Sequence, residues 1–280
     1  MGTGAFADQI VVVTGAGRGI GRAVALGFAA NGAQVVAADI DLAAARRTSA
    51  VIGAHGASGL DYRVDVASAV GMEQFAAWVR AEVGIPDVVV SNAGIAIVGS
   101  FLDHSEDDWE KIVGINLLGV ARGCRLFGAQ MAERGTGGQL VNIASAASWA
   151  PASTLPAYAA TKAAVRMLSE CLRIELAPAG IGVTAICPGF TSTGIARAAR
   201  YVGAAAGGQD SVRVAAIDGL ARRSFSPDKV ALAVMRAVLA NRPVVPVNAE
   251  AWLTYALSRV SPALLRRVSD GADKAMQRLG

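Results

Sequence analysis

The sequence has few of the residues that build metal sites, disulfide frameworks or strongly charged surfaces. Its 280 residues include two histidines and three cysteines, and charged side chains make up only 17% of the chain. The cysteines, Cys124, Cys171 and Cys187, are odd in number and scattered, so we expect reduced core residues rather than a disulfide or zinc framework. We predict no bound metal. Apolar residues make up 53% of the chain, which excludes a disordered protein.

Targeting and membrane-spanning segments are not apparent either. No run of about 18 consecutive apolar residues is present, so we predict no spanning helix. Residues 1–9 have neither a basic region nor a long apolar region, so they do not resemble a secretory signal. Together with the reduced cysteines, these features predict a cytoplasmic protein.

Positive charge is concentrated in the last third of the chain. The formal net charge is +4, and residues 191–280 carry 13 basic and 6 acidic side chains. A basic region favours an anionic partner, such as nucleic acid, a membrane surface or an acidic substrate. The arginines are interleaved with long apolar runs and no recognised nucleic-acid motif is present, so we expect no nucleic-acid partner.

Short runs rich in Val and Ile alternate with longer, alanine-rich amphipathic stretches. This alternation predicts an α/β fold: a doubly wound, Rossmann-like parallel sheet in three α/β/α layers. We expect strands at 10–14, 34–39, 59–64, 87–91, 139–144 and 182–187, and helices at 19–31, 41–52, 68–83, 106–134 and 157–178. No linker rich in Pro and Ser divides the chain, which indicates a single domain.

The regular alternation ends at residue 187. Residues 190–225 form a long stretch rich in Gly, Ala and Ser, and such a stretch in a compact domain is usually a binding loop. Ser226, Pro227 and Asp228 then supply an N-cap, a first-turn proline and a first-turn acid, which predicts a helix to about residue 241. Two amphipathic helices, broken at Ser261 and Pro262, are expected beyond it. We therefore divide the chain into a main domain, 1–247, and a helical extension, 248–280.

A glycine-rich run follows the first predicted strand and opens the next helix. It comprises Thr14, Gly15, Ala16, Gly17, Arg18, Gly19, Ile20 and Gly21. Glycines allow a tight turn and a close approach of the backbone to a pyrophosphate, and the helix N-terminus offers free N–H groups. Asp39 closes the second strand about 20 residues further on, where a carboxylate accepts hydrogen bonds from ribose hydroxyls and repels a 2′-phosphate. The run predicts a dinucleotide site.

Two alternatives stay open at this site. Asp39 starts a turn that ends at Asp41, and its carboxylate can equally cap the next helix. Arg18 is a basic side chain in the glycine loop that can pair with a 2′-phosphate, contact the pyrophosphate or lie in solvent. We give Asp39 the greater weight and predict NAD, with NADP less favoured.

A second group of polar residues points to chemistry at the same edge of the sheet. Tyr158 and Lys162 are one helical turn apart on one face. Ser145 and Asn92 each follow a predicted strand and should open onto the ligand crevice. A tyrosine packed on a lysine stem is also common in helices that have no catalytic role. Asn116 lies within an apolar helical stretch, where it is either a satisfied core amide or a residue that kinks the helix or binds water.

These motifs, in this order, resemble those of the short-chain dehydrogenase/reductase family. The matching elements are the TGxxxGxG run at 14–21, Ser91-Asn92-Ala93-Gly94 for NNAG, Asn116, Ser145, the YxxxK pair Tyr158 and Lys162, and Pro188-Gly189. The match covers residues 10–193. Ser91, Ala144 and Thr161 depart from the usual family residues, and none of these departures removes a reactive group.

The resemblance implies an oxidoreductase that moves a hydride between a nicotinamide cofactor and a secondary alcohol or ketone. It assigns Tyr158 as the acid/base, Lys162 to lowering the pKa of the phenol and holding the nicotinamide ribose, Ser145 to the substrate oxygen, and Asn116 to a water. The implied cofactor residues are Gly15, Gly17, Arg18, Gly19, Ile20, Gly21, Asp39, Asp65 and Val66 (adenine), Asn92 (ribose region), Ala93, Gly94, Tyr158, Lys162, Pro188, Gly189, Thr191 and Thr193 (carboxamide). Pairing through 106–134 and 157–178, as is usual in the family, implies a homodimer or homotetramer.

The extension 248–280 combines an apolar face with arginines, as interfacial helices do. It either packs on the body or on another subunit, or contacts a membrane surface or an amphiphilic substrate. We therefore hypothesise a lipophilic alcohol or ketone, and peripheral membrane association as one possible location. Trp149 and Leu155 either line the pocket or pack ordinarily. The rival functions are a non-catalytic nucleotide-sensing protein, an NADP-dependent carbonyl reductase, and an isomerase or dehydratase.

Overall fold

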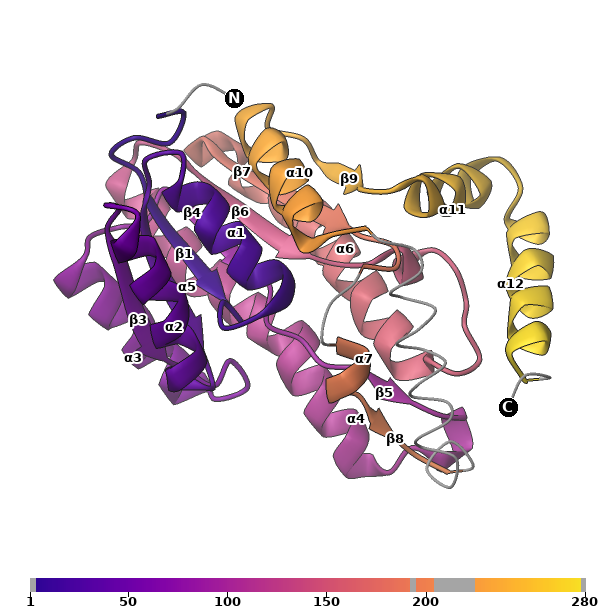
Figure 1. Ribbon diagram of the computed structural model, residues 1–280. Helices are drawn as coiled ribbons and strands as arrows, with labels where there is room; N and C mark the ends of the chain where they lie inside the picture. Colours follow the sequence, from indigo (N-terminus) through magenta and orange to yellow (C-terminus); the bar gives the residue numbers. More distant parts are fainter. Residues whose placement is uncertain (1–3, 192–194, 204–224, 278–280) are drawn as a thin grey trace.

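The computed structural model describes residues 4–191, 195–203 and 225–277. Its centre is a parallel sheet in the order β3-β2-β1-β4-β6-β7-β9 (Figure 1). The strands are β1 (Ile10–Thr14), β2 (Gln34–Asp39), β3 (Gly59–Arg63), β4 (Val88–Ser91), β6 (Gly138–Ile143), β7 (Ile181–Cys187) and β9 (Val244–Pro246). The predicted doubly wound α/β fold is confirmed, and the first six of these strands lie within one residue of their predicted bounds. The strand order reverses beside β1, so the carboxyl ends of β1 and β4 flank the point where such sheets bind ligands.

Helices cover both faces of the sheet. The core on one face joins α1 (Gly19–Ala29), α2 (Leu42–Ala54) and α10 (Pro227–Leu239) to strand residues such as Val11 and Val35. The core on the other face joins α3 (Ala69–Glu82), α5 (Gly119–Arg134) and α6 (Pro156–Leu176) to residues such as Val12 and Val36. Successive strand residues point to opposite faces, so central strands such as β1 and β4 are buried on both faces and are largely apolar.

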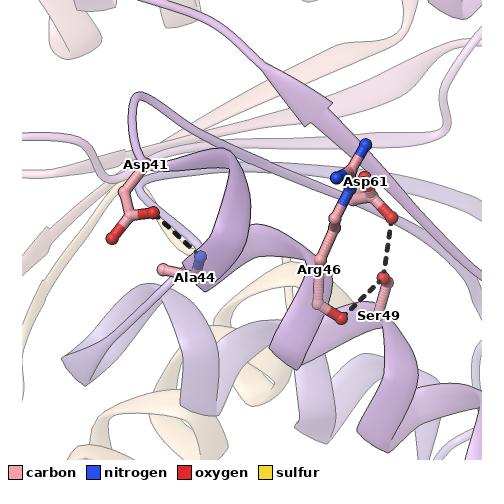
Figure 2. A network of polar contacts seen from close by, with 5 residues as sticks. All are labelled: Asp41, Ala44, Arg46, Ser49 and Asp61. Carbon is pink, nitrogen blue, oxygen red and sulfur yellow. Dashed lines mark hydrogen bonds and ion pairs between the residues drawn. The ribbon is translucent and has the colours of Figure 1, made fainter.

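Polar side chains cap the start of α2 and connect this helix to β3 (Figure 2). Asp41 is the N-cap, and its Oδ1 accepts a hydrogen bond from the Ala44 N–H at 3.1 Å. Ser49 Oγ lies 3.0 Å from Asp61 Oδ1 and 3.1 Å from the Arg46 carbonyl oxygen. Arg46 Nε lies 3.4 Å from Asp61 Oδ2. The contacts to Asp61 join α2 to β3, and the cap at Asp41 fixes the start of the helix that follows the end of β2.

The predicted helix at 106–134 contains a π-helical segment. α4 (Glu106–Val113) continues into η2 (Gly114–Leu118) and then into α5, and Asn116 is fully buried within η2. A π segment inside an α-helix is frequently found at a functional site. Contrary to our expectation, the run Glu106–Arg134 is long and apolar enough to cross a membrane by length and composition. Core helices pass the same test, and α5 packs its buried residues on the sheet.

The predicted pair of C-terminal helices is present beyond the last strand. α11 (Ala249–Val260) and α12 (Pro262–Gln277) are separated at Ser261 (Figure 1). Ser226 caps α10 as predicted, with its Oγ accepting a hydrogen bond from the Lys229 N–H at 3.4 Å, and that helix ends two residues before the predicted bound. We did not predict β9, whose three residues include a proline.

The described part of the predicted substrate loop is anchored beside the N-terminus of α6. The elements of this loop are α7 (Ile195–Ala198) and β8 (Arg200–Tyr201). Elsewhere in the chain, the short elements are β5 (Ile97–Val98), η1 (Phe101–Asp103), η3 (Ala146–Ser148) and η4 (Ala177–Ala179). β8 pairs with β5, and Arg200 Nε lies 3.0 Å from the buried Asp108 Oδ1. Val202 packs with Ile97 and Ala157. Most of 190–225, Thr193 included, lies outside the described residues.

The cysteines are unpaired, and their burial differs. Cys124 and Cys187 are buried as expected. Cys171 is exposed, so the prediction that it is a core residue was wrong. The buried residues of α6 include Thr161, Lys162, Val165 and Ser169, and Cys171 lies on the opposite side of that helix.

Candidate active site

The glycine loop between β1 and α1 is a backbone cradle in which side chains would not fit. Gly15 has a φ of +64°, and a Cβ atom there would lie 2.9 Å from the Ala93 Cα. A Cβ atom at Gly21 would lie 2.2 Å from the Gly15 carbonyl oxygen. The loop therefore needs glycine for both conformation and space, as a pyrophosphate cradle does. Arg18 is exposed at the N-cap of α1 and makes no side-chain capping bond.

Asp39 organises this cradle. Its carboxylate is buried, with Oδ2 accepting from the Gly17 N–H at 2.8 Å and Oδ1 from the Asp41 N–H at 3.0 Å. The alternative that Asp39 caps α2 was wrong, because the N-cap is Asp41. Each carboxylate oxygen has a further lone pair, so Asp39 can hold the loop and still accept from a hydroxyl.

The residues after β4 and β3 complete the same edge. Asn92 Nδ2 donates to the Thr14 carbonyl at 3.0 Å and to the Gly15 carbonyl at 3.1 Å, so its amide braces the glycine loop. The Ala93 N–H donates to Thr14 Oγ1 at 3.3 Å. Beyond β3, Asp65 Oδ1 accepts from the Ala67 N–H at 2.9 Å, and Val66 is buried next to it. The structure thus brings the predicted adenine and ribose residues to one edge of the sheet.

Ser145, Tyr158 and Lys162 meet at the carboxyl end of β6. Ser145 follows this strand, and its Oγ accepts from the Ala147 N–H at 3.1 Å. Tyr158 and Lys162 lie in the first turns of α6, which begins at Pro156. The Lys162 Nζ is buried, donates to the Ile143 carbonyl at 2.8 Å and lies 5.7 Å from the centroid of the Tyr158 ring.

Burial has the largest effect on the pKa values of Tyr158 and Lys162. It raises the pKa of the Tyr158 phenol, and a hydrogen bond from Ser145 opposes that rise. Burial also lowers the pKa of Lys162 to about 8. The Tyr158 pKa is therefore raised, and not lowered as expected, because desolvation of the phenol is the largest effect on it. Cys187, at the end of β7, has its pKa raised to about 12 by burial and stays a neutral thiol.

The depressed pKa of Lys162 predicts a pH-dependent stability difference between the wild type and Lys162→Met. With a folded pKa of about 8 and an unfolded value of 10.5, the unfolded chain binds more protons between these pH values. Stability of the wild type therefore rises with pH across this window, by about 1.4 kcal/mol per unit at most. We expect urea unfolding to show the wild type gaining about 2 kcal/mol relative to Lys162→Met between pH 7 and 9.5. A difference that does not change with pH would contradict this assignment.

Thr161, which differs from the usual family residue at this position, connects Tyr158 to Asn116. Its hydroxyl donates to the Tyr158 carbonyl at 2.8 Å and accepts from Asn116 Nδ2 at 3.2 Å. Asn116 Oδ1 in turn accepts from the Ile95 N–H at 2.9 Å, and its Nδ2 also donates to the Ile95 carbonyl at 3.0 Å. The Asn116 side chain is thus a satisfied core amide that links the π segment to α6. A Cβ atom at Gly94 would lie 3.5 Å from Lys162 Nζ, which places Gly94 beside this group.

The segment after β7 lies at the same edge. Pro188 is buried, and Thr191 Oγ1 donates to the Gly189 carbonyl at 3.1 Å. The Gly189 N–H donates to Asn248 Oδ1 at 3.2 Å, a partner that no motif indicated because it lies 59 residues further along the chain. Among the described residues, no group of three or more His, Cys, Asp or Glu side chains could hold a metal.

Comparisons with known proteins agree with this arrangement. Residues 9–201 match the family model described as short chain dehydrogenase. The chain is 46% identical over 268 residues to the probable oxidoreductase EphD of Mycobacterium tuberculosis H37Rv, covering 94% of this chain and 45% of that protein. It is 34% identical over 180 residues to D-threitol dehydrogenase of Mycolicibacterium smegmatis, covering 64% and 69% of the two chains. The chain thus spans less than half the length of the EphD proteins.

Solved structures share the fold over most of their length. A short chain dehydrogenase/reductase from Burkholderia phymatum in complex with NAD superposes with a TM-score of 0.82 at 30% identity, covering 95% of this chain and 97% of that one. A 3-ketoacyl-(acyl-carrier-protein) reductase from Brucella melitensis complexed with NADH gives a TM-score of 0.75 at 28% identity, covering 87% and 98%.

Proposed function

The chain belongs to the short-chain dehydrogenase/reductase family, and from this premise we propose that it transfers a hydride between NAD and a lipophilic secondary alcohol or ketone. One observation carries the proposal: Ser145, Tyr158 and Lys162 lie together beside a glycine cradle at one edge of the sheet. The cradle fits a dinucleotide, because added Cβ atoms at Gly15 and Gly21 would collide with the backbone of the loop and its neighbours.

The preference for NAD rests on Asp39. A buried carboxylate at the end of β2 favours a ribose with free hydroxyls and repels a 2′-phosphate. The relatives from Burkholderia and Brucella, solved with NAD and NADH, support this choice. Arg18 is exposed beside the loop, where its charge can face the pyrophosphate.

Tyr158, Ser145 and Lys162 have different roles in the proposed reaction. Bound NAD supplies a hydride acceptor for the carbinol C–H of the alcohol. Tyr158, as phenolate, accepts the hydroxyl proton as the C=O bond forms, and in the reverse direction the phenol returns it. Ser145 donates a hydrogen bond to the substrate oxygen. The Lys162 ammonium, 5.7 Å from the Tyr158 ring centroid, stabilises the phenolate during this step and offers hydrogen-bond donors to the ribose.

The direct test is an absorbance assay at 340 nm with NAD and NADP supplied separately. We expect NADH to form with secondary alcohols, and larger apolar alcohols to be better substrates than propan-2-ol. Tight NAD binding without absorbance change for any alcohol or ketone would favour the non-catalytic nucleotide-sensing alternative. Faster turnover with NADP would favour the carbonyl reductase alternative.

We further propose that residues 1–247 form the catalytic domain and that it assembles as a homodimer or homotetramer through α4, α5 and α6. Apolar side chains remain exposed on η2, which joins α4 to α5, and on α6, at Leu118, Met167 and Ile174. These are the surfaces that association would cover.

We propose that α12, within the extension 248–280, contacts an anionic membrane surface from the cytoplasm. Leu264 and Val268 are half-exposed and one turn apart, and the exposed Arg266 and Arg267 lie between them in the sequence. Apolar side chains beside arginines suit an interface that carries anionic headgroups.

We expect the protein to float with phosphatidylglycerol vesicles, and the double variant Leu264→Ser/Val268→Ser to remain in the soluble fraction. Leu239→Ser on α10, also half-exposed, is the matched control and should float. Equal flotation of wild type and double variant would contradict the membrane proposal.

A further inference from the structure

α11 is placed at the active edge of the sheet by the strand before it. β9 runs parallel to β7, with Pro246 beside Cys187, so the carboxyl ends of the two strands open on the same edge. α11 begins at Ala249, shortly after this end (Figure 1). A helix reached from the carboxyl end of a parallel strand lies beside the ligand crevice of the sheet.

The first turn of α11 is bonded to the segment that follows β7. Asn248 caps the helix, its Oδ1 accepting from the Ala251 N–H at 3.0 Å and from the Gly189 N–H at 3.2 Å. Asn248 Nδ2 donates to the Phe190 carbonyl at 3.4 Å, and the Phe190 N–H donates to Glu250 Oε2 at 3.4 Å. A Cβ atom at Gly189 would lie 2.5 Å from Asn248 Oδ1. A side chain at residue 189 would therefore collide with the N-cap of α11.

The middle of α11 contacts the segment that follows β6. Trp149 comes four residues after Ser145, and its ring centroid lies 5.2 Å from that of Tyr255. The Trp252 ring centroid lies 5.9 Å from that of Tyr255, and the Arg259 guanidinium lies 5.6 Å from the Tyr255 centroid. One helix thus contacts both segments that flank the predicted position of the substrate oxygen.

We propose that α11 forms a wall of the substrate site, and that Trp149 and Tyr255 select secondary alcohols with a bulky, apolar, ring-containing body. This inference rests on the proposed dehydrogenase function. Trp149 and Tyr255 are each only half-buried, and Phe190 and Trp252 are 47% and 54% exposed, which leaves aromatic surface at this edge. Aromatic faces gain most from covering apolar rings, and they offer little to a short polyol.

The test compares a graded series of alcohols: propan-2-ol, cyclohexanol and a hydroxysteroid. We expect Tyr255→Ala to lower kcat/KM for the hydroxysteroid about tenfold or more, chiefly through KM, and to leave propan-2-ol within about twofold. Tyr255→Phe keeps the ring and should restore the wild-type order of substrates. Equal losses for all three alcohols, or no loss for the hydroxysteroid, would overturn the proposal.

Tyr62→Ala is the matched control. Tyr62 is also a half-buried tyrosine paired with a tryptophan, with its ring 4.8 Å from that of Trp78, but this pair lies on β3 and α3. A general loss from breaking an aromatic pair would appear in both variants. A loss selective for the hydroxysteroid is expected in Tyr255→Ala alone.

Calorimetric titration separates this proposal from the proposed function. In the presence of NADH, which cannot accept a hydride from the alcohol, the hydroxysteroid should bind wild type and Tyr158→Phe equally, and Tyr255→Ala about tenfold more weakly. If this binding pattern is found without turnover by the wild type, the proposed role of α11 is supported and the dehydrogenase proposal fails. If small alcohols are oxidised while the hydroxysteroid binds no better than cyclohexanol, the wall proposal fails and the dehydrogenase proposal stands.

Discussion

Tyr158→Phe is expected to lower turnover by about 10³-fold or more, because general acid–base catalysis by one side chain contributes about 10² to 10⁴. The substitution removes only the phenolic oxygen. The ring stays in the cluster that contains Ile97, Ala157 and Val202, so the fold and the position of Lys162 should be kept. Initial rates at 340 nm measure the loss, and titration with NAD should give a dissociation constant within about twofold of the wild type.

Tyr62→Phe is the control for this variant. It makes the same chemical change at a half-buried ring that packs against Phe75 and Trp78, away from the glycine cradle. Its turnover should match that of the wild type. Retained activity in Tyr158→Phe would remove Tyr158 from the mechanism and with it the proposed acid/base.

Asp39→Asn is expected to weaken NAD binding by about 10- to 100-fold, since a hydrogen bond to a charged group contributes about 1.5–3 kcal/mol. The two carboxylate oxygens each accept a backbone N–H, from Gly17 and from Asp41. An amide has one acceptor oxygen, so its NH₂ group would face one of those donors and the glycine loop would lose a support. Calorimetric titration with NAD measures the loss.

The same substitution should reduce the preference for NAD over NADP. Removing the charge of Asp39 removes the repulsion of a 2′-phosphate, so NADP affinity should fall much less than NAD affinity. Asp41→Asn is the matched control: it removes a charge two residues away, and asparagine is an equally good N-cap for α2. A ratio of NAD to NADP affinity that is the same in Asp39→Asn and wild type would contradict the assigned role.

The main sheet could be predicted closely because its central strands are buried on both faces. A run such as Val11–Val13 is apolar at every position and leaves little choice of assignment. β9 escaped prediction because pairing with β7, rather than its own three residues, makes it a strand. The π segment was not predicted for a related reason. It changes the helical register only slightly, and the hydrogen bonds of Asn116 are made to Ile95, which lies outside the helix.

The residues of the candidate site could be predicted from the sequence, but the hydrogen bonds between them could not. Motifs name Asp39, Tyr158 and Lys162, but they do not show that the Asp39 carboxylate bonds the Gly17 N–H. They also do not reveal that burial raises the Tyr158 pKa, because desolvation depends on packing from several elements. Thr161 and Asn248 were missed as site residues, since their partners across the fold give them their roles.

Transfer of an isotope label from the alcohol to the nucleotide is a direct test of hydride transfer by this site. The protein is incubated with NAD and with cyclohexanol or a hydroxysteroid that carries deuterium on the carbinol carbon, and the nucleotide product is analysed by mass spectrometry. We expect NADH that has gained one deuterium with the wild type, and no labelled NADH with Tyr158→Phe. Unlabelled nucleotide with the wild type, in the presence of bound NAD and these alcohols or their ketone products, would contradict hydride transfer by this site.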